Sequence, residues 1–264
     1  MTTALDRILE YKADEVAELK RTRSMSALER EASLADPCRG FSDRMFSVAE
    51  KGRNAVICEI KRRSPSAGQI KDIASPNEAA RAYETGGAAC ISVLTDGPSF
   101  GGSNDDLRAV RSSVKLPVLR KDFMIDVSQV LEARSIGADA ILVIMAAVDD
   151  ELALDLHAAA QDLGMSVLIE VHDEVELERA MKLSSPLLGV NNRDLKTFTT
   201  DLGITERLSK YIPNDRLLIA ESGVRDAEDV KRLRKSNARG FLVGESVMRA
   251  ENTSDAVQAL VNVR

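Results

Sequence analysis

From residue 54 onward, short runs of Val, Ile and Leu alternate with stretches that have apolar residues at helical spacing. Eight runs have the length and composition of buried strands, at residues 54–61, 90–96, 117–123, 140–146, 166–171, 187–192, 217–222 and 240–246. Between them apolar side chains recur three or four positions apart, as Leu152, Leu156 and Ala159 do. Apolar strands that alternate with helices are typical of a parallel sheet covered by helices.

Eight strand–helix units fit either a closed (β/α)8 barrel or an open, doubly wound sheet. The strands begin at fairly even intervals of roughly 20 to 35 residues, which favours the barrel. No GxGxxG follows the first strand, so a dinucleotide-binding sheet is disfavoured. We therefore predict one α/β domain over residues 1–264, built as a (β/α)8 TIM barrel.

The first 53 residues precede the barrel pattern. Leu5, Ile8, Leu9, Val16 and Leu19 lie on one face of a predicted amphipathic helix, and a second helical segment is expected near residues 41–51. We expect residues 1–53 to form a helical extension over the barrel mouth.

Composition narrows the class of protein. The 264 residues are 44% hydrophobic and carry a net charge of −6, so no overall basic field would attract nucleic acid or an anionic membrane. The three cysteines have neither disulfide-framework nor zinc-site spacing. The N-terminus lacks the pattern of a signal peptide, and the apolar runs are too short to span a membrane. We expect a soluble cytoplasmic protein, monomeric or weakly homo-oligomeric, without nucleic-acid or membrane partners.

Polar side chains stand at the ends of five predicted strands. In a barrel of parallel strands these ends meet at one face, where enzymes of this fold have their active sites. Residues two apart on a strand share a face, so each strand directs alternate side chains into the mouth. A lone charge at a strand end is usually solvated, but five such strands together favour a functional cavity. The residues expected there are Glu59, Lys61, Lys121, Glu170, Asn191, Arg193 and Glu221.

Glycines follow the last two strands, at Gly223 and Gly244. Barrel enzymes commonly bind phosphate through backbone N–H groups at these two positions. Either glycine alone is ordinary turn chemistry, but the pair predicts a phosphate-bearing ligand. Ser222 and the segment that begins at Glu245 would add amides, with the Glu245 carboxylate turned away. Lys61 or a neighbouring cation would neutralise the anion.

The motifs EIKRRSPSAG, VLRKDF, LIEVHDEVELERA, GVNNRDLKTF, ESGV and FLVGESVM occur in this order along the chain. Together with LDRILEYKADEV and LTDGPSFGGSNDDL they resemble the indole-3-glycerol-phosphate synthase family of tryptophan biosynthesis. The resemblance covers essentially the whole chain. It implies a carboxy-lyase that converts 1-(2-carboxyphenylamino)-1-deoxyribulose 5-phosphate into indole-3-glycerol phosphate, CO2 and water, without metal or organic cofactor. The matching positions are Glu59, Lys61, Ser64, Lys121, Phe123, Glu170, Asn191, Arg193, Glu221, Ser222, Gly223 and Gly244.

The implied reaction assigns roles to these positions. Ring closure needs an ammonium at the ketone oxygen, and Lys121 is the expected general acid, although Lys61 is near enough to leave the first donor open. Lys61 with Glu59 would release the hydroxyl, and Glu170 would act as base. The remaining substrate contacts are expected from Arg193, Asn191, Ser64, Glu221 and Phe123.

Two other functions compete with this interpretation. The isomerase one step earlier in the same pathway also binds a phosphate, but it needs a Cys–Asp pair, whereas Cys58 and Cys90 lie in apolar runs. A non-catalytic barrel would have lost an acid–base residue, and none is missing. His157 and His172 are expected at the surface, without a role.

Overall fold

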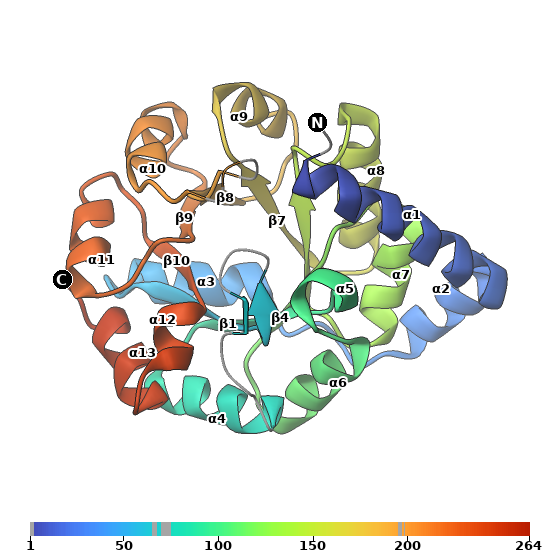
Figure 1. Ribbon diagram of the computed structural model, residues 1–264, viewed down its shortest axis with the longest axis horizontal. Coiled ribbons are helices and arrows are strands. Elements are labelled where there is room, and N and C mark those ends of the chain that lie inside the picture. Colours follow the sequence, from blue (N-terminus) through green and yellow to red (C-terminus); the bar gives the residue numbers. More distant parts are fainter. Residues whose placement is uncertain (1–2, 65–67, 70–74, 195–196, 198) are drawn as a thin grey trace.

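The computed structural model describes residues 3–64, 68–69, 75–194, 197 and 199–264. Its central feature is a closed barrel of parallel strands in the order β1-β10-β9-β8-β7-β6-β5-β4 (Figure 1), which confirms the predicted fold class. Each strand falls within one of the eight predicted runs. The strands are β1 Ala55–Ile60, β4 Cys90–Leu94, β5 Val118–Lys121, β6 Ala140–Ile144, β7 Ser166–Val171, β8 Leu187–Asn191, β9 Leu217–Glu221 and β10 Gly240–Val243.

The barrel closes through β1, which pairs with β10 on one side and with β4 on the other. Side chains alternate between the barrel interior and the layer beneath the helices. One buried cluster fills the interior, with Ile57, Leu119, Leu142, Leu168 and Ile219 among its members. The other lies between strands and helices, and includes Ile91, Val118, Ile141, Val167 and Ile169.

Helices follow the strands and surround the barrel (Figure 1). Several begin at an aspartate whose side chain accepts backbone N–H groups of the first turn, among them Asp126, Asp149, Asp173 and Asp226. The helices are α4 Pro76–Gly86, α5 Gly97–Phe100, α6 Asn104–Ser113, α7 Val127–Ser135, α8 Asp150–Asp162, α9 Glu174–Ala180, α10 Gly203–Leu208, α11 Ala227–Arg234, α12 Glu245–Arg249 and α13 Thr253–Val261, with a 3-10 turn η1 at Ser209–Tyr211.

The N-terminal segment forms three helices, α1 Ala4–Thr22, α2 Met25–Leu34 and α3 Phe41–Glu50. The sequence did not predict α2, which is short and buries only Leu28 and Ala32 against α7 and α1. The expected cover over the mouth involves only part of the segment. α1 contributes Leu5 and Ile8 to the mouth cavity. α3 lies at the opposite end, where the Ser42 N–H donates to Ser166 Oγ at the start of β7.

A small antiparallel pair that the sequence did not predict, β2 Arg63–Ser64 with β3 Gly68–Gln69, follows β1. Ser64 pairs with Gly68 through its backbone, but the predicted substrate contact of its side chain lies outside the described residues. Among the helices described, none has the length and apolar character needed to cross a membrane.

Candidate active site

A cavity of about 660 Å³ opens at the carboxyl ends of the barrel strands. The polar positions predicted from the strand ends converge on it, together with Phe123 from the β5–α7 loop. Apart from Ser64, every predicted site residue lines this cavity. They are Glu59, Lys61, Lys121, Phe123, Glu170, Asn191, Arg193, Glu221, Ser222, Gly223, Gly244 and Glu245.

Lys121 occupies the centre of the polar cluster. Its Nζ lies 3.1 Å from Glu170 Oε2 and 2.9 Å from Glu221 Oε2, so the ammonium from β5 bridges carboxyl groups at the ends of β7 and β9. Burial alone would lower the pKa of Lys121, but the carboxylates of Glu170, Glu221 and Glu59 outweigh burial and raise it. Lys121 is therefore a cation at neutral pH, held where three carboxylates face the cavity.

The two carboxyl groups beside Lys121 differ in their ionisation. Burial raises the pKa of both, but Lys121, His172 and Asn191 reverse this effect at Glu170 and hold its pKa well below the usual range. At Glu221 burial prevails, helped by the nearby Glu170 carboxylate and opposed by Lys121, and the pKa rises to about 7. Buried Oε1 of Glu221 has no hydrogen-bond partner among the residues that the structure describes. Near neutrality Glu170 is thus a carboxylate, whereas Glu221 exchanges a proton.

Glu59 and Lys61 form a second ion pair in the cavity, with Lys61 Nζ 2.6 Å from Glu59 Oε1. The Tyr83 hydroxyl donates to the Glu59 carbonyl at 3.0 Å and anchors this strand end. Gly244, at the end of β10, leaves space for the Glu59 side chain, because a Cβ there would lie 2.9 Å from Oε1. The ion pair between Glu59 and Lys61 shows that the two side chains lie on the same face of the strand end, as predicted.

Asn191 connects the fifth and sixth predicted strand ends. Its Nδ2 donates to Glu170 Oε1 at 2.9 Å, and its Oδ1 accepts the backbone N–H of Arg193 at 3.0 Å. Phe123 lies on the apolar side of the cavity, with its ring 6.2 Å from that of Phe100. The cavity therefore has one wall suited to an aromatic ring and one wall of ionised groups.

The predicted phosphate end lies beside β9 and β10. Ser222 and Gly223 both have positive φ, 60° and 80°, which turns the chain sharply after β9. A Cβ on Gly223 would lie 2.4 Å from Thr200 Cγ2, so a larger residue does not fit this turn. The carboxylate of Glu245 pairs with Arg249 on α12 at 3.0 Å.

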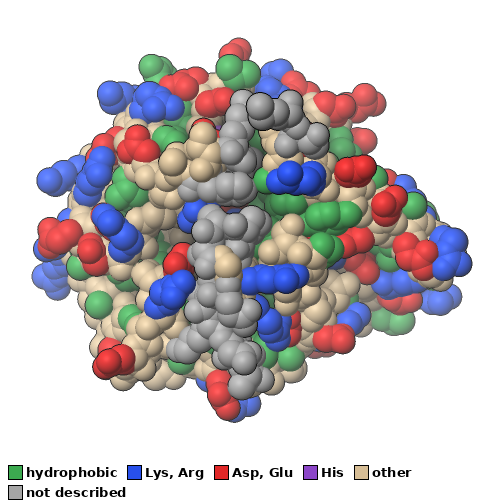
Figure 2. Space-filling model, viewed as in Figure 1, with side chains coloured by type: hydrophobic (Ala, Val, Ile, Leu, Met, Phe, Trp, Pro, Cys, Tyr) green, Lys and Arg blue, Asp and Glu red, His purple; other side chains and the backbone are tan. Residues whose placement is uncertain are grey.

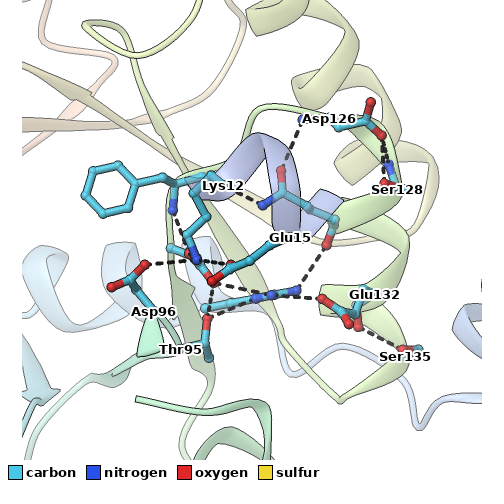
Figure 3. Close-up of polar contacts among 12 residues, drawn as sticks. Lys12, Glu15, Thr95, Asp96, Asp126, Ser128, Glu132 and Ser135 are labelled. Carbon is cyan, nitrogen blue, oxygen red and sulfur yellow. Dashed lines mark hydrogen bonds and ion pairs between the residues drawn. The ribbon is translucent and has the colours of Figure 1, made fainter. Parts of the chain in front are cut away.

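A buried ionic cluster beside the cavity attaches α1 to the loops after β4 and β5. Lys12 Nζ, only 2% exposed, lies 2.6 Å from Glu15, 2.9 Å from Asp96 and 2.8 Å from Asp122 (Figure 3). Arg120 joins it through Asp122 at 3.3 Å. Side chains alternate along a strand, so the sequence indicates that Arg120 and Asp122 lie on the face opposite to Lys121. Nothing in the sequence of α1 identifies Lys12 as the partner of Asp122.

The surface positions predicted for the two histidines are wrong. His157 on α8 is buried, 5% exposed, and within the described part of the chain its Nε2 has no hydrogen-bond partner. His172 lies directly behind the cluster, with Nε2 3.3 Å from Glu170 Oε1. A single histidine after a strand carries no sequence signal for such a contact.

The rim of the mouth carries both signs of charge. Acidic and basic side chains are interspersed around it on the face shown in Figure 2. The residues that the structure describes include no group of three or more His, Cys, Asp or Glu side chains arranged to hold a metal ion. The described site thus consists of lysines, carboxylates, amides and an aromatic wall.

Two sequence comparisons with known proteins agree on one family. The sequence model described as "Indole-3-glycerol phosphate synthase" matches residues 5–260. A protein of that name from Hyphomonas neptunium is 58% identical over 98% of this chain and 97% of its own length. One from Rhodospirillum rubrum is 51% identical over 99% of this chain and all of its own length. The solved thiamine phosphate pyrophosphorylase from Pyrococcus furiosus shares the fold alone, with 16% identity, a TM-score of 0.57, and 78% of this chain and 92% of its own covered.

Proposed function

This chain belongs to the indole-3-glycerol phosphate synthase family, and from that premise we propose how its barrel-mouth residues perform the reaction. The enzyme is a decarboxylating lyase of tryptophan biosynthesis that forms indole-3-glycerol phosphate. The observation that carries the assignment of roles is the Lys121 ammonium between Glu170 and Glu221 in the cavity.

Ring closure joins a carbon of the anilino ring to the ketone carbon of the substrate chain. As that bond forms, the electron pair of the C=O bond moves to oxygen, which needs a positive charge and then a proton. Lys121 supplies both, because neighbouring carboxylates keep it protonated and its position at the cavity centre faces the reacting carbons. A positioned acid of this kind contributes about 10² to 10⁴-fold in rate.

Two bonds break after ring closure. Loss of the ring carboxylate as CO2 leaves its electron pair in the ring system, and departure of the hydroxyl as water completes the aromatic indole. Lys61, paired with Glu59, protonates the leaving hydroxyl. Glu170 removes the ring proton, which requires the carboxylate form favoured by its lowered pKa.

The remaining residues bind the substrate. Arg193 and Asn191 hold its carboxylate, and a guanidinium suits that group because it can donate two parallel hydrogen bonds. Phe123 lies against the aromatic ring, and Ser64 assists from the β2 segment. The amides of Ser222, Gly223, Gly244 and Glu245 hold the phosphate, with Lys61 as its counter-charge. Glu221 contacts the ribulose hydroxyls or the anilino nitrogen.

An assay with the carboxyphenylamino-deoxyribulose phosphate tests this function. Indole fluorescence should increase with time and with enzyme concentration, and one CO2 should be released for each indole formed. The double variant Lys61→Ala/Lys121→Ala is the control, because it lacks both proposed acids. The assignment of the activity fails if the purified chain gives no fluorescence, and the acid roles fail if the double variant matches the wild type.

The same proposal places the enzyme in the cytoplasm as a monomer or weak homo-oligomer, without nucleic-acid or membrane partners. Its support is that one chain supplies all the proposed catalytic side chains. Specific activity should then stay constant as the protein is diluted through the range where sedimentation velocity reports dissociation. A loss of specific activity on dilution would contradict an independent site in each chain.

A further inference from the structure

His172 lies outside the cavity lining but contacts the proposed base. It follows β7 directly, and its side chain is 11% exposed. One ring nitrogen, Nε2, lies 3.3 Å from Glu170 Oε1, and the other, Nδ1, lies 3.0 Å from Glu176 Oε2. The ring therefore stands between two carboxylates, one facing the cavity and the other on α9.

We propose that His172 is a positioning residue, an imidazolium fixed by Glu176 that keeps the Glu170 carboxylate ionised and oriented for proton removal. The inference rests on the proposed function, because it assigns His172 a purpose through the role of Glu170 as base. His172 itself does not contact the substrate.

The two carboxylate neighbours determine the protonation of the ring. A neutral imidazole donates from one nitrogen only and presents a lone pair at the other. Here a lone pair at Nδ1 would face the Glu176 carboxylate, whereas the imidazolium donates an N–H to Glu176. Nε2 lies 3.3 Å from Glu170 Oε1, an ion-pair distance without the alignment of a hydrogen bond, so the positive charge rather than a hydrogen bond acts on Glu170. Burial alone would lower the pKa of His172, but Glu170 and Glu176 outweigh it and raise the pKa to about 10. The geometry and the charges thus favour the same state.

The ring is also fixed in place. Oε2 of Glu176 accepts the backbone N–H of His172 at 2.8 Å and also contacts its Nδ1. Glu176 is itself held in the first turn of α9, where its N–H donates to the N-cap Asp173 at 2.8 Å. A helix start therefore fixes the carboxylate that orients His172, and His172 in turn faces the carboxylate at the end of β7.

Charge balance explains why such a cation is useful. The proposed base Glu170 is 2% exposed and shares the single ammonium of Lys121 with Glu221. One ammonium does not neutralise two buried carboxylates, and the surplus charge favours protonation of one of them. The imidazolium of His172 stabilises the charged form of Glu170. The proton is then held preferentially by Glu221, whose pKa is raised to about 7.

Oε1 and Oε2 of Glu170 receive different partners. Asn191 Nδ2 and His172 Nε2 both approach Oε1, and Lys121 approaches Oε2. The charged groups around the imidazole are thus Glu170 from β7 and Glu176 from α9, with Lys121 from β5 beyond Glu170. Substitution of His172 removes the contact on Glu170 that α9 controls through Glu176.

The protonation state can be measured directly, because the chain contains two histidines. Imidazole NMR titration of the wild type, assigned with His157→Gln, should show His172 titrating near pH 10 and His157 below its ordinary value. Glu176→Gln should lower the His172 value. A wild-type His172 that titrates near 6.5 or lower would overturn the proposal, and this result does not depend on turnover.

The kinetic test compares His172→Gln with His157→Gln, a substitution of the other buried histidine. His172→Gln retains a hydrogen-bonding group but lacks the charge, so the acidic limb of the kcat/KM profile should move up by about one pH unit, and kcat should fall about tenfold. His172→Lys, which restores a cation, should return the limb toward its wild-type position. His157→Gln should lower thermal stability without moving the limb.

Equal pH profiles for His172→Gln and His157→Gln would reduce His172 to a packing role and overturn the inference. Failure of the proposed function has a different signature. In that case the wild type gives no indole fluorescence, while the NMR titration still reports whether His172 is an imidazolium between two carboxylates.

Discussion

A Cβ atom on Gly189 of β8 would lie 2.1 Å from Oε1 of Glu221, so the glycine provides the space that this carboxyl group occupies. Gly189→Ala should therefore displace Glu221 from Lys121 and lower kcat at least about tenfold. The change in kcat should exceed the change in stability that the methyl group causes. Steady-state kinetics and urea unfolding measure the two effects.

Gly240→Ala is the matched control for Gly189→Ala. A Cβ on Gly240 would lie 2.4 Å from Ile219 Cγ1, so it crowds the same barrel interior but touches an apolar side chain. We expect Gly240→Ala to cost stability while the enzyme that remains folded keeps its kcat. Equal losses of kcat in both variants would show that the effect of Gly189→Ala is general strain.

Lys121→Ala tests the proposed general acid. The variant lacks the ammonium that polarises the ketone, and kcat should fall at least about a hundredfold while the fold survives. Lys115→Ala, at an exposed position before the same strand, serves as control. Circular dichroism checks that the variant is folded, and single-turnover kinetics measure the chemical step. Turnover near the wild-type value would remove Lys121 from the acid role.

Glu221 makes a testable contribution to the pH dependence of stability. Folding raises its pKa from 4.5 to about 7, mainly through burial and the nearby Glu170 carboxylate. Its contribution is therefore fully present below pH 4.5 and is lost as the pH rises through 7. The free energy of unfolding of Glu221→Gln, minus that of the wild type, should increase over this interval. A constant difference between the two proteins would contradict the raised pKa.

Lys12→Met tests the attachment of α1. The substitution leaves Asp96 and Asp122 buried without their shared ammonium, which should cost about 3 to 5 kcal/mol in the free energy of unfolding. Lys20→Met, on the same helix as Lys12, removes a partly exposed pair with Asp126, the N-cap of α7, and should cost about 0 to 1 kcal/mol. Urea unfolding gives both values, and similar losses would argue against a special role for Lys12.

Arg193→Ala tests the proposed carboxylate clamp. KM should rise at least about tenfold with a smaller change in kcat, because the guanidinium binds a group that is present before the chemical step. Arg193→Lys keeps the charge but cannot make two parallel hydrogen bonds, so its KM should lie between those of the wild type and Arg193→Ala. An unchanged KM and kcat in Arg193→Ala would discard the clamp.

The sequence predicts the barrel and much of the cavity because a strand obeys a period of two. Parity alone places Lys121 inward, and its contact with Glu170 confirms that direction. Asp122 follows the end of β5, where it pairs with Lys12 of α1 and also lines the cavity. Parity gives no information on partners that come from other elements. Lys12 and His172 could not be identified for that reason, since each depends on how α1 or α9 packs against a loop.

The alternating faces of β5 also bear on which length changes this chain can accept. A one-residue insertion within β5 would send Arg120 into the mouth and Lys121 under the helices, so attachment of α1 and catalysis would fail together. The same insertion in β6 would move Ile141 and Val143 to the face that Leu142 and Ile144 now occupy, and the reverse. All four side chains are apolar, so both faces of β6 would remain apolar. Tolerance to insertion should therefore differ between two adjacent strands, and β6 is the safer place to begin a redesign of the barrel.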